Sequence, residues 1–184
     1  MLSMNYRSDL GREKRVSYIS SMFSLFLRCF LVFMMPIAVL ALPRDASAQL
    51  LNRTAVYSKA SVSIASGEKT HKFRVELALT QKQHMQGLMY RRKLAADAGM
   101  LFVYQREAPI AMWMKNTYLP LDMLFIGRDG RIVKIAERTV PLSETTISSG
   151  VAAIAVLELN AGTASRLGVG SGDTVIAEAL GNAH

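Results

Sequence analysis

The stretch LDMLFIGRDGRIVKIAE, residues 121–137, carries the strongest structural signal of the chain. Its Asp129-Gly130 dipeptide lies between two apolar segments, and an Asp-Gly pair in that setting is a strong indication of a tight β-hairpin turn. After the turn, the apolar positions are Ile132, Val133 and Ile135. We therefore expect residues 121–126 and 131–137 to be antiparallel neighbours.

Most of the remaining chain after residue 48 also has strand patterns. Apolar and polar residues alternate over residues 56–64 and 73–79, which is the period of half-buried strands. The turn-forming segment SGEKT between them indicates another hairpin. Further strands are expected at residues 99–104, 110–115, 151–159 and 174–179.

Two short helices complete the expected elements. Thr80, with Gln83 three residues later, forms a capping-box pattern that opens the first helix. Asn160 is expected to cap a second helix that ends at Leu167, with Gly168 in a positive-φ conformation behind it. Because strands outnumber helices, the predicted fold class is α+β, mainly β: a compact antiparallel curled sheet or partial barrel with two short helices.

Residues 1–48 have the layout of a secretory signal peptide. A basic region precedes the apolar run CFLVFMMPIAVLAL, and Ala46-Ser47-Ala48 follows as a small-x-small cleavage signature. The run is shorter than the roughly 20 residues that a spanning helix needs. We therefore expect cleavage after Ala48 and an exported protein, periplasmic or secreted. The alternative is an uncleaved membrane anchor that begins near Met22.

The domain organisation follows from this division. Residues 49–69 are expected to form an N-terminal lead and the first strand, and residues 70–184 a single globular domain. Removal of residues 1–48 takes away six basic and three acidic residues, so 16 basic and 11 acidic residues remain, a net charge of +5. The basic residues are scattered, which argues against nucleic acid as a partner. Membrane contact is expected only through residues 1–48, if they stay attached.

The cysteine count excludes several chemistries. The single cysteine, Cys29, lies in the segment expected to be removed. A thiol nucleophile, a disulfide and a cysteine metal site are therefore not expected in the exported chain.

Polar residues interrupt the apolar stretch MWMKNTYLPLDMLF, residues 112–125. If residues 110–116 pair with residues 121–126 across the loop TYLP, Lys115 faces Asp122, since opposed residues have Cβ atoms about 5 Å apart. The strand around Asp122 is apolar on both faces, so an unpaired carboxylate there would cost several kcal/mol.

Two interpretations of these polar residues remain open. In the first, Lys115 and Asp122 form a structural ion pair, which is weak evidence for function. In the second, they belong to a polar pocket in which Lys115 and Asn116 donate hydrogen bonds, Asp122 accepts and Trp113 forms a flat wall.

Four sequence blocks occur in order: GLMYR (87–91), AGMLFVY (98–104), WMKNTYLPLDMLF (113–125) and VLELNAG (156–162). Together they resemble the domain of unknown function 192 family, DUF192, of small and often exported prokaryotic proteins. The resemblance implies a small β-rich, barrel-like fold without an established reaction or cofactor, and a role in signalling or ligand binding. The residues that the blocks carry over are Gly87, Met89, Arg91, Gly99, Trp113, Lys115, Asn116, Thr117, Asp122, Glu158 and Asn160.

From this set we select candidate ligand-binding residues: Met89, Arg91, Trp113, Lys115, Asn116, Thr117, Asp122 and Glu158. Glu158 lies in an apolar strand, so it is expected to pair with a cation, as Asp122 is. No residue is assigned as catalytic or metal-binding, and no cofactor is implied.

Three function classes are compatible with these features. The favoured one is non-catalytic binding of a small polar, sugar-like ligand or of a signalling or envelope partner. The second is periplasmic copper handling by methionine thioethers, which suit Cu(I), although methionine commonly fills cores. The third is a hydrolase in which Asp122 works with Glu144 or Glu158 across a cleft.

Overall fold

The computed structural model describes residues 55–183. The expectations for residues 1–48, namely the signal peptide, its cleavage and the alternative anchor, lie outside the described residues. Within residues 55–183, no helix has both the length and the apolar character needed to cross a bilayer.

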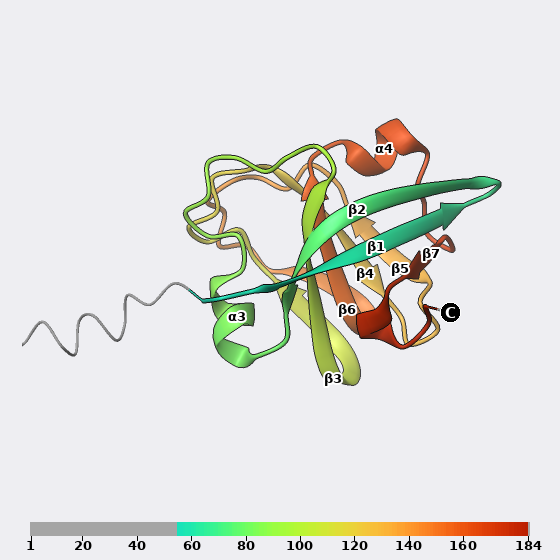
Figure 1. Cartoon of the computed structure of the whole chain (residues 1–184). Helices are drawn as coiled ribbons and strands as arrows, with labels where there is room; N and C mark the ends of the chain where they lie inside the picture. Colours follow the sequence, from blue (N-terminus) through green and yellow to red (C-terminus); the bar gives the residue numbers. More distant parts are fainter. Residues whose placement is uncertain (1–54, 184) are drawn as a thin grey trace, which may run out of the picture. The chain divides into compact units, whose positions relative to one another are not determined.

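The described part consists of seven strands and two short α-helices (Figure 1). The strands are β1 (Ser58–Ser66), β2 (Lys69–Ala78), β3 (Ala98–Met112), β4 (Leu121–Ile126), β5 (Ile132–Ala136), β6 (Ile147–Asn160) and β7 (Thr174–Ile176). The helices are α3 (Gln81–Gln86) and α4 (Thr163–Leu167), and a 3-10 turn, η1 (Glu178–Leu180), follows β7.

The strands form one curled sheet with the order β5-β4-β6-β3-β2-β1-β7. All neighbours are antiparallel except β2 and β3. The two edges of the sheet approach each other: Arg131 forms a bridge with Thr174, and the Ile132 N–H donates to the Asp173 carbonyl at 2.8 Å. The predicted fold class, a mainly β partial barrel with two short helices, is confirmed.

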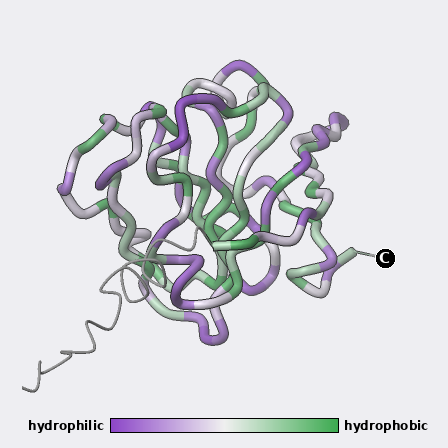
Figure 2. Tube along the Cα trace, turned by 60° about the vertical axis from the view of Figure 1, so that its left-hand side comes forward, coloured by the Kyte–Doolittle hydropathy of each residue, from purple (hydrophilic) through white to green (hydrophobic). Residues whose placement is uncertain are grey.

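The curled sheet separates two apolar cores. The inner core takes buried residues from all seven strands, including Leu124 and Ile126 of β4. The outer core lies on the other face and includes Leu121, Met123 and Phe125. All six residues of β4 are buried, so the expectation that this strand is covered on both faces is confirmed. In Figure 2 the hydrophobic segments lie mainly in the centre of the described part and the hydrophilic segments at its periphery.

The two hairpins predicted from alternation and turn residues are present. β1 pairs with β2 in continuous register from Ser58↔Leu77 to Ser66↔Lys69. β4 pairs with β5, and Gly130 in the turn between them has φ 80°. Glycine adopts this left-handed region without the steric penalty of a Cβ atom.

The pairing of residues 110–116 with residues 121–126 is wrong. β4 lies between β5 and β6, and β6 separates it from β3. The strands predicted at residues 99–104 and 110–115 belong to one long strand, β3. The interruption expected between them corresponds to a register shift against β6 between Val103 and Ala108.

Gly99 allows β3 and β6 to approach closely. A Cβ atom on Gly99 would lie 2.5 Å from the carbonyl oxygen of Glu158, which is far inside van der Waals contact. This position therefore needs glycine for a packing reason.

The ends of the helices follow the predicted pattern only in part. The capping box of α3 is confirmed, since the Gln83 N–H donates to Thr80 Oγ1 at 3.3 Å and the Thr80 N–H donates to Gln83 Oε1 at 3.0 Å. Gly168 after α4 has φ 73°, as expected. The last strand was predicted to extend to residue 179, but β7 ends at Ile176.

Asn160 does not cap α4. The helix begins at Thr163 and its N-cap is Gly162, which has no side chain to satisfy the first N–H groups. Asn160 ends β6 instead, and its amide donates to the carbonyls of Leu94 and Ala95 at 3.2 and 2.9 Å.

Candidate functional site

A row of side chains crosses the outer face of the sheet from β2 to β4. Register places Glu76 beside Met100, Met100 beside Glu158, and Glu158 beside Met123. Paired residues project to the same face, so the carboxyl groups of Glu76 and Glu158 both lie on the outer face. Because adjacent strands are about 4.8 Å apart, the backbones that carry the two carboxyl groups are separated by about 10 Å.

Glu158 is the buried acid of this row, with 4% of its surface exposed. Burial raises the pKa of its carboxyl group to about 8, because the charged form loses its hydration there. Within residues 55–183 no cation contacts this carboxyl group, and burial alone accounts for the shift in its pKa. The expectation that Glu158 pairs with a cation is therefore wrong.

Glu158 borders a pocket of about 250 Å³ between α3 and the outer face of the sheet. The α3 side contributes His84, Met85, Leu88 and Met89, and β3 contributes Phe102, Tyr104 and Met112. Trp113, Thr117 and Glu158 also line it, together with Gln81, Gln86, Gly87 and Ala111, and no lysine or arginine of the described residues does. Its lining is thus mainly apolar and aromatic, with one strongly buried carboxyl group.

His84 and Tyr104 stack within this pocket. Their ring centroids are 4.5 Å apart, and His84 Nε2 lies 2.9 Å from the Ala78 carbonyl oxygen. A carbonyl can only accept, so Nε2 carries the hydrogen and Nδ1 retains its lone pair in the neutral ring. Burial raises the pKa of Tyr104 to about 12, and its hydroxyl donates to Met112 Sδ at 3.5 Å.

Trp113 lies at the rim of the pocket with 48% of its surface exposed. It follows the last residue of β3, which ends at Met112 and does not pair with β4. Lys115 Nζ lies 5.3 Å from the Trp113 ring centroid, within the range of a cation–π interaction. The same ammonium group lies 3.4 Å from the carboxylate of Glu144.

Asp122 has a structural role on the inner face of the sheet. It pairs with Leu159 in the register, one position away from Glu158, so the two carboxyl groups project to opposite faces. Asp122 Oδ1 accepts from the N–H groups of Arg138 and Gly162 at 2.9 and 3.0 Å. Oδ2 accepts from the Ala164 N–H at 2.9 Å. Asp122 therefore satisfies the N-terminal N–H groups of α4, whose N-cap residue, Gly162, has no side chain to do so.

Two expectations about Asp122 are wrong as a result. It forms no ion pair with Lys115, whose ammonium group faces Glu144 at the surface. It also shares no cleft with Glu158, so the geometry does not support a hydrolase that uses these two carboxyl groups. A pair with Glu144 fails for a related reason: Asp122 is fully buried, whereas the Glu144 side chain is 63% exposed.

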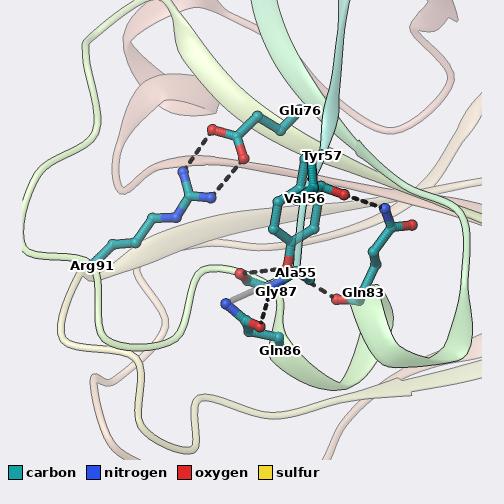
Figure 3. A network of polar contacts seen from close by, with 8 residues as sticks. All are labelled: Ala55, Val56, Tyr57, Glu76, Gln83, Gln86, Gly87 and Arg91. Atoms are coloured by element: carbon teal, nitrogen blue, oxygen red, sulfur yellow. Dashed lines mark hydrogen bonds and ion pairs between the residues drawn. The ribbon is translucent and has the colours of Figure 1, made fainter. Parts of the chain in front are cut away.

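Arg91 forms a two-pronged ion pair with Glu76 beside the pocket (Figure 3). Nη1 and Nη2 donate to the two carboxylate oxygens at 2.7 and 2.6 Å. This hydrogen bonding lowers the pKa of Glu76. The guanidinium carbon also lies 5.7 Å from the ring centroid of Tyr57. The guanidinium group of Arg91 and the carboxylate of Glu76 therefore satisfy each other within the protein.

Residues 55–57, which precede β1, are hydrogen-bonded to α3 and to Gly87 after it (Figure 3). The Ala55 N–H donates to Gln86 Oε1 at 2.8 Å, and the Gln83 side-chain amide donates to the Val56 carbonyl at 2.7 Å. The Tyr57 hydroxyl donates to the carbonyl of Gly87 at 3.2 Å. These contacts fix the position of the helical wall of the pocket.

Strained backbone concentrates in the loops next to the pocket. Tyr90, Asn116 and Leu142 have φ values of 65°, 55° and 63°, a region that costs L-residues about 1–2 kcal/mol. The three loops are hydrogen-bonded to each other: the Tyr90 N–H donates to the Asn116 carbonyl at 2.8 Å, and the Leu142 N–H to the Thr117 carbonyl at 3.0 Å. Strain of this kind tends to cluster at functional sites.

The structure divides the eight candidate residues into three groups. Met89, Trp113, Thr117 and Glu158 line the pocket. Arg91, Lys115 and Asn116 lie around it without lining it, and the Asn116 amide contacts Met89 Sδ at 3.9 Å. Asp122 lies on the other face of the sheet.

Several lining residues were not selected from the sequence: His84, Met85, Phe102, Tyr104 and Met112. Gln81 and Met85 are four residues apart within α3, a spacing that brings side chains to one face of a helix. Alternation along β3 puts Phe102 and Tyr104 on the same face as Met100. These signals were available, but only the fold shows that the two faces meet.

The fold and the pocket define the class of protein: a small, curled-sheet domain with a pocket on the outer face of the sheet. The family model of DUF192, described as an uncharacterized ACR, matches residues 62–177. The chain belongs to this family, as its sequence blocks indicated. Among curated proteins, none matches the chain.

Two solved structures resemble the chain over its described part. A proposed transcription regulator from Sinorhizobium meliloti 1021 is 50% identical, with a TM-score of 0.67, covering 68% of this chain and 98% of its own. A protein of unknown function from Novosphingobium aromaticivorans DSM 12444 is 36% identical, with a TM-score of 0.63, covering 67% of this chain and 94% of its own.

Proposed function

We propose that this protein is an exported binding domain that holds a small ligand in the pocket between α3 and the sheet, without catalysing a reaction. The observation that carries the proposal is Glu158, a carboxyl group with 4% exposure and no cation partner among the described residues, at a pocket of about 250 Å³. Ionising a buried carboxyl group without a cation nearby is costly. A polar ligand group that contacts Glu158 would offset that cost.

The pocket favours a ligand with an apolar part. Lys115, Asn116 and Asp122, the donors and acceptor on which the expectation of a sugar-like ligand depended, do not line it. Its volume is below the roughly 300–1,000 Å³ of pockets for drug-sized ligands. The occupant is therefore a molecule of a few heavy atoms, or the end of a longer one.

Binding is favoured over hydrolysis because, among the described residues, one carboxyl group lines the pocket. Hydrolysis by paired carboxyl groups needs an acid and a second carboxylate across the scissile bond. Glu76, a second carboxylate on this face, is held by both nitrogens of the Arg91 fork.

A ligand screen with matched variants tests the proposal. The purified protein is screened against small amines, alcohols, acids and sugars by Trp113 fluorescence, since Trp113 is the only tryptophan of the chain and lines the pocket. A ligand of the pocket should change the emission and lose affinity in Glu158→Gln. Glu178→Gln, an exposed carboxyl group in η1, is the control. A hit whose affinity is the same in both variants would contradict the proposal.

Export is tested separately by fractionation of cells and by N-terminal sequencing. The expected product is found outside the cytoplasm and begins at Gln49. A product that retains residues 1–48 in the membrane fraction would support the anchor instead.

Cu(I) binding is a second candidate function, because the same pocket brings together Met85, Met89, Met112 and His84. Thioethers and a neutral imidazole are suitable ligands for Cu(I). Leucine variants of the three pocket methionines should each weaken Cu(I) binding in a competition assay. Met123→Leu, a core position outside the pocket, should not. Absence of competition at micromolar Cu(I) would rule this candidate out.

A further inference from the structure

The charges around the pocket distinguish between classes of ligand. No lysine or arginine of the described residues lines it, and the acid that borders it, Glu158, is nearly inaccessible to solvent. Neighbouring cations are already engaged: Arg91 with Glu76, and Lys115 with Glu144. An anionic ligand would therefore meet a carboxyl group and no cation, whereas a cationic ligand would supply the positive charge that the carboxyl group lacks.

The walls suit a cation on an apolar stem. Phe102, Tyr104 and Trp113 present aromatic rings, whose faces attract cations. The thioethers of Met85, Met89 and Met112 offer polarizable apolar surface that adapts to irregular shapes. Trp113 already has one ammonium group, that of Lys115, 5.3 Å from its ring centroid.

We propose that the pocket binds a primary ammonium group on a short apolar stem, with the ammonium nitrogen at the Glu158 carboxylate and the stem among the methionine and aromatic side chains. This inference depends on the proposed function and assigns its ligand class. The ammonium group can belong to a free alkylamine or to a lysine side chain of another protein, since both present the same chemistry.

Binding of the ammonium ion releases a proton. In the empty pocket the carboxyl group of Glu158 is protonated at neutral pH, because burial raises its pKa to about 8. An ammonium ion binds the ionised form, so the carboxyl proton leaves to solvent and an N–H···O ion pair forms. Protons are therefore released on binding below pH 8, and affinity for the ammonium ion rises with pH in that range.

Four other ionisable side chains of the described residues lie near Glu158. The charge of Glu76 on β2 is compensated by Arg91. Tyr57 before β1 and Tyr104 on β3 have pKa values raised by burial, so both stay neutral over this range. His84 on α3 lines the same pocket.

Calorimetric titration of the full-length protein tests the inference. Butylammonium chloride is compared with the neutral isostere 1-butanol and with butyrate, each at pH 7 in two buffers of different ionisation enthalpy. Nα-acetyl-lysine methylamide represents a lysine side chain. We expect butylammonium to bind at least tenfold more tightly than 1-butanol, butyrate to show no binding, and protons to be released on binding of butylammonium.

Variants complete the test. Glu158→Gln should lose at least tenfold in butylammonium affinity and all proton release, whereas Glu178→Gln should keep both. If Nα-acetyl-lysine methylamide binds more tightly than butylammonium, the site is assigned to the lysine side chain of another protein. If butylammonium binds more tightly, the site is assigned to a free amine. Equal affinity for 1-butanol and butylammonium overturns the cation inference while the binding function stands. If neither these compounds nor any compound of the screen binds, both fail.

Discussion

Replacing Asp122 by asparagine should destabilise the protein by about 3 kcal/mol. The carboxylate accepts three backbone N–H groups, from Arg138, Gly162 and Ala164, at 2.9 to 3.0 Å. An asparagine has one accepting oxygen and a donating NH₂ group, so in its best orientation two bonds survive and the NH₂ group faces the Ala164 N–H. Losing a hydrogen bond to a charged group costs about 1.5–3 kcal/mol, and a buried donor without a partner costs about 1–3 kcal/mol.

Urea denaturation followed by circular dichroism measures this loss. Hydrogen exchange should show faster exchange at the amides of Gly162 and Ala164, because both lose their acceptor. The control is Lys115→Met, which breaks a partly exposed pair with Glu144 and should cost less than about 1 kcal/mol. The double variant of Asp122 and Lys115 should equal the sum of the two losses to within about 0.5 kcal/mol.

Two outcomes would refute this explanation. A loss below about 1 kcal/mol for Asp122→Asn would show that the three N–H groups find other acceptors. A coupling above about 1 kcal/mol between Asp122 and Lys115 would restore the direct ion pair that the structure excludes.

Three further predictions concern the outer face and the β3–β6 contact. The folded-state pKa of Glu158, about 8, lies above its ordinary value of 4.5, so the folded state binds more protons than the unfolded state. The free energy of unfolding should therefore fall as pH rises from 4.5 to 8. At pH 7 this free energy should be about 3 kcal/mol lower than at pH 4.5. Urea denaturation at pH 4.5 and 7 should show this slope in the wild type and not in Glu158→Gln, and equal slopes would contradict it. Gly99→Ala should cost at least about 3 kcal/mol, because its Cβ would lie 2.5 Å from a backbone oxygen and overpacking alone costs about 1–3 kcal/mol; a melting temperature equal to that of the wild type would disprove the close approach. Arg91→Lys should cost about 1 kcal/mol through loss of the guanidinium fork and raise the pKa of Glu76 towards its ordinary value, measured by NMR titration; an unchanged titration would show that Arg91 does not set it.

Local signals in the sequence predicted the elements that depend on local geometry. The hairpin around Asp129-Gly130 and the capping box of Thr80 and Gln83 each involve residues a few positions apart. Their energetics do not depend on where the rest of the chain lies, so a single sequence is sufficient to find them. The two-sided burial of β4 followed from its composition in the same way.

Strand neighbours beyond a tight turn could not be predicted from the same signals. Residues 110–116 and 121–126 are close in sequence and both apolar, which favoured a direct pairing. In the fold, the Met114 N–H donates to the Ser143 carbonyl at 2.9 Å, so the chain after β3 packs against a distant loop. β6 then fills the place beside β4. Lys115 and Asp122 were separated by this long-range choice.

The candidate site was predicted in part for a related reason. Glu158 and Trp113 are conspicuous as a carboxyl group in an apolar strand and as the only tryptophan. Met85 and Met112 are inconspicuous, because methionine is an ordinary core residue. Their role as walls becomes visible only when α3 and β3 are placed together.

Each face of the sheet contains one of two buried carboxyl groups, those of Asp122 and Glu158, and the two groups differ in their partners. This difference is the strongest argument for a ligand. On the inner face, Asp122 is fully satisfied by backbone donors, as a structural acid should be. On the outer face, Glu158 has no cation partner among the described residues, although a glutamine or methionine of similar size would avoid the cost of ionising it there. A ligand that supplies the missing positive charge would recover that cost as binding free energy. Because such a ligand binds only the folded state, it would also raise the free energy of unfolding, so the stability that Glu158 removes from the empty protein becomes affinity for the occupant.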